Sequence, residues 1–198
     1  MGRTAVAVVI TALLLLCAGC IVPSLQPLYT DETAVAAPGL PGSWADTNNA
    51  TTYTFTPGEG KAYRLDCTDK EGAKSAFVCH VVTLDGRSFI DMYPVDLEQA
   101  CPGYAPWHFM PVHSFYLIEQ LTPSLRVSTL NPDWLGKYCA ENPDVIGTAS
   151  LALGGNDSMP VFTATTAELQ MFLRENVDTP DAYYGAVELT PVVPTAPK

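Results

Sequence analysis

The sequence predicts a mainly β (α+β) fold, an antiparallel meander that forms a barrel or half-barrel and carries two short helices. Three observations predict it. Segments of alternating apolar and polar residues recur at intervals of about ten residues, and Asp85-Gly86 is typical of a two-residue hairpin turn. Two later segments begin with helix-capping residues. The chain of 198 residues has room for one such domain.

The predicted strands are rich in β-branched and aromatic residues and are separated by turn residues. The segment after residue 93, as far as residue 107, is irregular, and Gly154 to Asp157 is predicted as a hairpin turn. The strands are expected at residues 52–56, 62–67, 76–84, 88–93, 112–119, 124–130 and 186–189.

Both helices have recognisable starts. Asn131 is the expected N-cap of the first, with Pro132 at its first position, and this helix is expected to end near Asn142. Thr165 and Glu168 form a capping box at the start of the second. An apolar stripe follows on that helix, consisting of Leu169, Phe172, Leu173 and Val177.

Residues 1–19 have the layout of a secretory signal peptide. Arg3 supplies the positive charge, an apolar run covers residues 5–16, and the small residues Ala18 and Gly19 follow. A membrane-spanning helix needs about 20 apolar residues, so this run is too short for an anchor that stays in place.

Cys17-Ala18-Gly19-Cys20 resembles the lipobox of bacterial lipoproteins, with Cys17 at a position where that family usually has leucine. The resemblance implies diacylglycerol on the Cys20 thiol, cleavage before Cys20 and acylation of the new amino terminus. Several acyl chains make a stable membrane anchor. Because Ile21 rather than an aspartate follows, the resemblance implies, for a host with two membranes, the outer membrane, with the protein facing the periplasm.

Segments 19–30, 42–44 and 107–113 are similar to a family of uncharacterised bacterial lipoproteins, and the similarity runs over most of the chain. That family implies a location but no activity. Gly42-Ser43-Trp44 is also similar to the G-x-W motif of lipocalin-like barrels. The motif implies that Trp44 plugs the floor of a barrel, and eight strands enclose about one small ligand. The alternative is an ordinary core role for Trp44.

After removal of residues 1–19, we expect a lipidated, proline-rich tether at 20–41, one β-rich domain at 42–190 and a disordered tail at 191–198. The apolar stretch from Leu25 to Tyr29 leaves open that the tether lies along the domain surface. The loss of Arg3 leaves nine basic residues against 21 acidic ones, a net charge of −12. Nucleic acid is therefore excluded as a partner, and membrane contact is expected through the lipid on Cys20.

Four cysteines remain in the mature chain: Cys67, Cys79, Cys101 and Cys139. An even number in an exported protein favours disulfides, and four cysteines allow three connectivities. Cys67 and Cys79 lie at equal parity in two predicted neighbouring strands, so the expected pairs are Cys67–Cys79 and Cys101–Cys139. The alternative is that some remain free as small core residues.

Catalytic and metal sites are not predicted, and no cofactor is expected. The sequence has no G-x-S-x-G elbow and no glycine-rich phosphate loop. Side chains of types that bind metals occur at His108 and His113, with Asp91 or His80 as a candidate third ligand. A spacing of five residues, however, places the two histidines on opposite faces of a strand. Structural hydrogen bonding is the expected role of both.

Aromatic residues form either a solid core or the wall of an apolar pocket. We therefore predict a non-catalytic envelope protein that binds a partner or a small apolar ligand. The alternative is a structural or assembly accessory of an envelope complex, and the third hypothesis is a hydrolytic enzyme. The candidate binding residues are Trp44, Trp107, His108 and His113. The aromatic set is Tyr53, Phe55, Tyr63, Phe77, Phe89, Tyr93, Trp107, Phe109, Phe115 and Tyr116.

Overall fold

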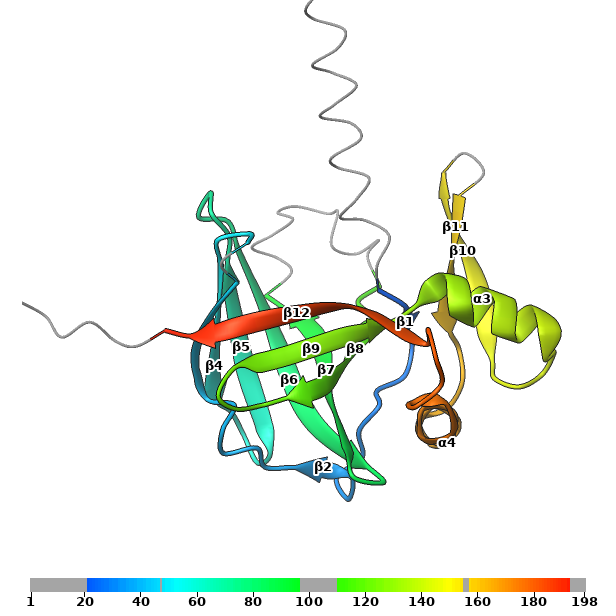
Figure 1. Cartoon of the computed structure of the whole chain (residues 1–198), viewed down its shortest axis with the longest axis horizontal. Helices are drawn as coiled ribbons and strands as arrows, with labels where there is room; N and C mark the ends of the chain where they lie inside the picture. Colours follow the sequence, from blue (N-terminus) through cyan, green and yellow to red (C-terminus); the bar gives the residue numbers. More distant parts are fainter. Residues whose placement is uncertain (1–20, 47, 97–109, 155–156, 193–198) are drawn as a thin grey trace, which may run out of the picture.

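The computed structural model describes residues 21–46, 48–96, 110–154 and 157–192. Eight antiparallel strands close into a barrel, which confirms the predicted mainly β meander and shows that the barrel is complete (Figure 1). Its strands are β3 (Gly42–Asp46), β4 (Thr51–Pro57), β5 (Ala62–Thr68), β6 (Lys74–Leu84), β7 (Arg87–Val95), β8 (His113–Gln120), β9 (Leu125–Leu130) and β12 (Tyr183–Pro191).

Neighbouring barrel strands are consecutive from β3 to β9, and β12 closes the ring. Leu189 of β12 faces Leu125 of β9, and Thr190 faces Ala45 of β3. The predicted tight turn between β6 and β7 is present, because Asp85 and Gly86 both have positive φ, 48° and 83°. These angles are the ones that a two-residue hairpin requires.

A helical and hairpin unit is inserted between β9 and β12, beside the barrel (Figure 1). The Asn131 side chain accepts hydrogen bonds from two backbone amides at the start of the first helix, and Thr165 and Glu168 form the predicted capping box of the second. The unit consists of α3 (Pro132–Glu141), β10 (Thr148–Gly154), β11 (Asp157–Phe162) and α4 (Thr166–Asn176).

Side-chain alternation along the strands produces two apolar cores. Along β6, for example, Cys79 and Val81 point into the barrel, whereas Val82 and Leu84 point outward. The outward core is covered by α3, α4 and β11 and includes Val22, Leu28, Phe89, Phe162, Leu169 and Phe172. The inward core includes Leu40, Trp44, Phe55, Tyr63, Leu65, Ile90, Leu125 and Leu189.

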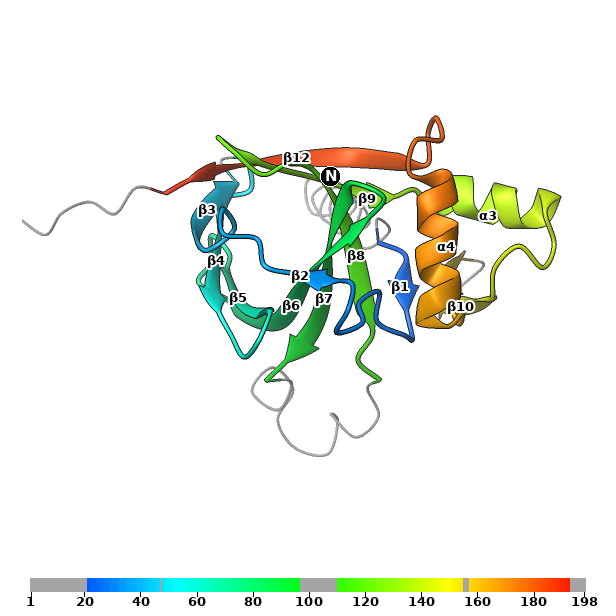
Figure 2. The same cartoon turned by 90° about the horizontal axis from the view of Figure 1, so that it is seen from below.

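Residues 21–41, expected as a tether, are instead part of the folded domain, so that expectation is wrong for this stretch. They include β1 (Pro23–Ser24), which pairs with β8 and β11, and β2 (Ala34–Val35), which pairs with β6. The segment first runs along the outside of the barrel, and from β2 onward it crosses one end of the barrel (Figure 2). Val22, Leu28 and Leu40 are 3%, 0% and 0% exposed. Burial of these apolar side chains outweighs the tendency of proline-rich sequence to remain extended in solvent.

Candidate ligand cavity at one end of the barrel

A cavity of about 370 Å³ opens at the end of the barrel where β5 turns into β6. Five consecutive strands, β4 to β8, each contribute one inward side chain to its wall. The alternation of a barrel strand places every second residue inside, which is why a row of single residues from successive strands meets here. These wall residues are Tyr53, Cys67, Phe77, Met92 and Tyr116, and the rim is formed by Thr51, Asp69, Ala73, Lys74 and Ser75.

The wall combines aromatic rings and sulfur atoms with two phenol groups. Burial raises the pKa of Tyr116 to about 12 and also raises that of Tyr53. Both phenols are therefore protonated at neutral pH. Burial also raises the pKa of the Cys67 thiol to about 11, so this sulfur is a neutral, soft wall atom and not a thiolate nucleophile.

The opposite end of the barrel is closed by chain segment 35–41 and by Trp44. The indole N–H of Trp44 donates to the Leu40 carbonyl oxygen at 2.9 Å, and the Ala37 amide donates to the Tyr63 hydroxyl at 2.7 Å. Trp44 is 5% exposed. Its side chain thus belongs to the packed inward core, and it is absent from the cavity wall.

Other hollows in the described part of the chain differ in character from the barrel cavity, and one of them, beside the end of α3, has the same volume of about 370 Å³. A hollow of about 410 Å³ shares Cys67, Lys74, Ser75 and Phe77 with it and extends over the outer rim. Another, of about 680 Å³, lies between α3 and the β10–β11 hairpin. Small and polar residues dominate the lining of this last hollow, whereas ligand pockets are usually walled by aromatic and apolar side chains.

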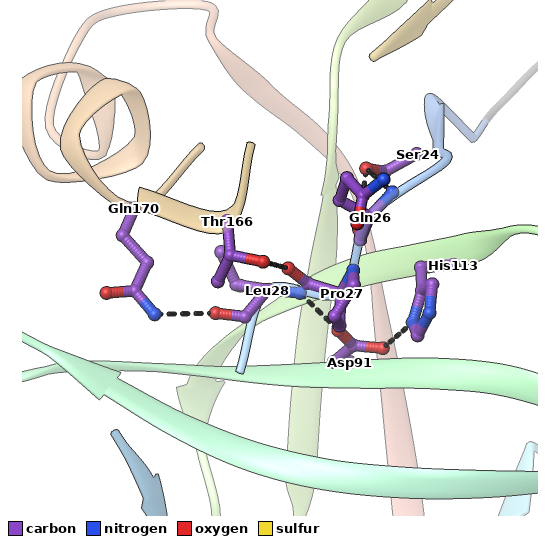
Figure 3. A network of polar contacts seen from close by, with 8 residues as sticks. All are labelled: Ser24, Gln26, Pro27, Leu28, Asp91, His113, Thr166 and Gln170. Carbon is purple, nitrogen blue, oxygen red and sulfur yellow. Dashed lines mark hydrogen bonds and ion pairs between the residues drawn. The ribbon is translucent and has the colours of Figure 1, made fainter. Parts of the chain in front are cut away.

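A buried carboxylate fixes the N-terminal segment to the outside of the barrel (Figure 3). Asp91, on β7, is 1% exposed. One of its oxygens accepts the Leu28 amide at 2.6 Å, and the other accepts the His113 Nδ1–H at 2.7 Å. A buried charge is tolerated where donors satisfy it in this way. Asp91 therefore acts as an anchor for the segment.

Helix α4 holds the same segment from the other side. The Thr166 hydroxyl donates to the Pro27 carbonyl oxygen at 2.7 Å, and the Gln170 amide donates to the Leu28 carbonyl oxygen at 2.8 Å (Figure 3). Ser24, opposite His113 in the ladder, donates its hydroxyl to the Gln26 carbonyl oxygen. The polar groups of residues 24–28 are thus engaged in holding the chain in place.

His80 lies next to this network under an aromatic ring. The Tyr29 ring stacks on the imidazole with centroids 3.6 Å apart and an interplanar angle of 17°. Desolvation lowers the pKa of His80 below its usual value, against the opposing effect of Asp91. Burial therefore favours the neutral imidazole.

The predicted site residues are dispersed. His113 is in the Asp91 network, with Tyr93 at 4.6 Å between ring centroids, and Trp44 is in the inward core. Trp107 and His108 lie outside the described residues. Among the residues that the structure describes, no group of three or more histidine, cysteine or acidic side chains is arranged to hold a metal ion.

The structure contradicts the predicted Cys67–Cys79 disulfide. Both side chains face the barrel interior, but Cys67 pairs with Ser75 and Cys79 pairs with Tyr63. An offset of four residues is roughly 13 Å along a strand, whereas a disulfide requires Cα atoms within about 7 Å. Cys67, Cys79 and Cys139 are free thiols. Cys101, the expected partner of Cys139, lies outside the described residues.

Sequence reasoning identified the aromatic residues of the cavity only as members of a larger set. Tyr53, Phe77 and Tyr116 line the cavity, while Phe55 and Tyr63 fill the core below it. Met92 and Cys67 were missed as wall residues. Parity could have placed both side chains inside the barrel, because each lies an even number of residues from an inward residue on its own strand, but it could not have placed them at the level of the cavity.

Comparison with known proteins yields no relatives: no family model, no curated protein and no solved structure matches the chain. Within the described residues, neither helix has the length and apolar character needed to cross a membrane.

Proposed function

We propose that this protein is a lipid-anchored envelope protein whose barrel binds a small, mainly apolar ligand at its open end, without catalysing a reaction. The observation that carries the proposal is the cavity of about 370 Å³ with one inward side chain from each of five consecutive strands. This volume lies in the range of small-molecule sites, about 300–1,000 Å³.

The chemistry of the wall defines the class of ligand. Three aromatic rings and two sulfur-containing side chains favour a flat or flexible apolar molecule. Tyr53 and Tyr116 remain protonated and can donate hydrogen bonds, which favours a ligand that carries an acceptor oxygen. Asp69 and Lys74 are both at the rim, so the rim gives no preference for a charged ligand of either sign.

The anchor part of the proposal rests on the lipobox-like segment that ends at Cys20. Replacing Cys20 with alanine should release the mature protein from the membrane fraction, because no acyl chain could then be attached to that side chain. The measurement is membrane fractionation followed by mass spectrometry of the N-terminal peptide. Retention of Cys20→Ala on membranes, or an unmodified N-terminal peptide in the wild type, would contradict the anchor.

The cavity is tested with a neutral fluorescent probe, N-phenyl-1-naphthylamine, and a filling substitution. Ser75 is on the rim, and Ser75→Phe should place a ring in the cavity and weaken probe binding by at least about tenfold, equivalent to about 1.4 kcal/mol. Thr83→Phe is the matched control, since Thr83 is exposed at the other end of the same strand.

Equal probe affinity in the two variants would show that the probe binds elsewhere and would contradict the proposal. Native mass spectrometry of protein extracted from its own host provides an independent measurement. A retained mass that Ser75→Phe eliminates and Thr83→Phe preserves supports the barrel as its site.

A further inference from the structure

The folded body begins almost immediately after the expected lipid. Ile21 alone separates Cys20 from Val22, which is 3% exposed, and Ser24, two residues further on, is 0% exposed. Both are fixed in the fold, Val22 in the outward core and Ser24 in a ladder between β8 and β11. A lipid on Cys20 would therefore hold Val22, the first buried residue, within two extended residues, about 7 Å of chain, of the anchored cysteine.

Exposed apolar side chains gather at this same edge. Ser24 pairs with Phe162 in the parallel β1–β11 ladder. If that register is continued for three residues beyond the ladder, Ile21 lies next to Met159. Met159 in turn pairs with Leu151 of β10. Ile21 and Leu151 are 38% and 49% exposed. Leu25 is also 38% exposed. It lies four residues after Ile21, an even number, so the alternation of an extended chain directs both side chains to the same face.

These side chains lie on one face of the β1–β11–β10 sheet. Val22 and Phe162 point to the opposite face, where they pack with Phe172 of α4. Because side chains alternate along a strand, Ile21 and Met159 point away from α4, and Leu151 follows its partner Met159. We call Ile21, Leu25, Leu151 and Met159 the apolar edge patch.

We propose that the apolar edge patch inserts into the acyl-chain boundary of the bilayer that holds the lipid, so that the barrel rests against the membrane in one orientation. This inference rests on the proposed lipid anchor. The one-residue connection brings the patch to the bilayer, and apolar burial holds it there. The mature chain has a net charge of −12, so attraction to anionic headgroups is not the force that orients it.

The test uses the full-length lipidated protein reconstituted into phosphatidylcholine vesicles with and without bromine on the acyl chains. Bromine quenches a nearby indole, so Leu151→Trp adds a reporter at the patch. Met171→Trp is the matched control, because Met171 is 54% exposed on α4, which covers the other face of the sheet. The three native tryptophans supply the wild-type background.

Each variant adds indole emission to the wild-type background, and bromine quenches a fraction of this added emission. We expect that fraction to be at least about twofold larger for Leu151→Trp than for Met171→Trp. Equal quenching of the two variants on vesicles that retain the protein would overturn the patch while leaving the lipid anchor intact. Failure of the wild type to float with the vesicles would remove the anchor, and the inference with it. Matching urea unfolding midpoints establish that both variants are folded.

Discussion

Asp91 shows how a single buried charge determines the course of a whole segment. Its two oxygens accept one backbone amide from residues 21–41 and one imidazole N–H from β8. Neither donor is close to Asp91 in the sequence, since Leu28 is 63 residues away and His113 is 22 residues away. The carboxylate thus joins three parts of the chain in a setting where unpaired polar groups are costly.

Asp91→Asn should lower the free energy of unfolding by about 2–3 kcal/mol, because the amide is a weaker acceptor and leaves a buried donor poorly satisfied. Urea denaturation measures the change. Asp96→Asn is the control: Asp96 forms an exposed ion pair with Arg64, and such a pair contributes about 1 kcal/mol or less. Equal losses in the two variants would contradict the anchor role.

The pH dependence of stability should carry a contribution from His80. Desolvation lowers the pKa of His80 in the folded state, so between the two pKa values the unfolded chain binds more protons than the folded protein. The stabilising contribution is present above the unfolded pKa of about 6.5 and is lost as pH falls through the lower folded pKa.

His80→Phe keeps a ring against Tyr29 but cannot titrate. We therefore expect the wild type to lose more stability than His80→Phe between about pH 7.5 and about pH 5. Urea midpoints of both proteins at each pH measure the difference. A parallel decline of the two midpoints would show that other groups produce the pH dependence.

Prediction from sequence was weakest for individual side chains. Tyr53 and Tyr116 were recognisable as strand aromatics, but alternation alone does not distinguish a wall residue from a core residue at the same parity, such as Phe55. That distinction depends on the level of the residue in the closed barrel, which only the register between strands determines. The Cys67–Cys79 pairing failed for the same reason, since equal parity was correct and the level was wrong.

At the scale of elements, local sequence signals were sufficient to predict a helix start or a hairpin where the chain contains capping or turn residues. The starts of α3 and α4 follow from capping residues, because a side chain must satisfy the free amides of the first turn. The β6–β7 hairpin follows from Asp85-Gly86. By contrast, β1 and β2 are two residues each, and they form only because their partners in the barrel are already in place.

Thr165→Ala should destabilise the protein by about 1 kcal/mol, the usual cost of losing an N-cap. The Thr165 hydroxyl oxygen accepts the Glu168 amide, and the Glu168 carboxylate accepts the Thr165 amide at 2.8 Å. Glu175→Ala, an exposed position on the same helix, should change stability by less than about 0.5 kcal/mol. Thermal unfolding followed by circular dichroism compares them, and no difference between the two would count against the capping box.

Over the whole molecule, the two cores share the barrel wall, so neither can be exposed without disrupting the other. Inward and outward residues alternate on β6, with Val81 in one core and Val82 in the other. We therefore expect both cores to unfold in a single cooperative transition, although one is enclosed by the barrel and the other is covered by helices.

Thiol labelling tests this cooperativity. Cys79 is 0% exposed and burial raises its pKa, so a soluble thiol reagent should modify it at least about a thousandfold more slowly in the native protein than in urea. Peptide mapping by mass spectrometry follows Cys79, with Cys139, which is only partly buried, as the internal reference. A Cys79 that is unmodified even in urea would indicate a disulfide and contradict the free thiol.

The position of β12 in the ring has a consequence for how the chain folds. Residues 183–191 are the only link between β3 and β9 in the described barrel, and they come after every other strand in the sequence. A chain that emerges from its N-terminus therefore presents two unpaired sheet edges until this segment arrives. Such edges invite association with other chains, so the time between the emergence of β9 and of β12 is the interval in which the chain is most exposed to aggregation.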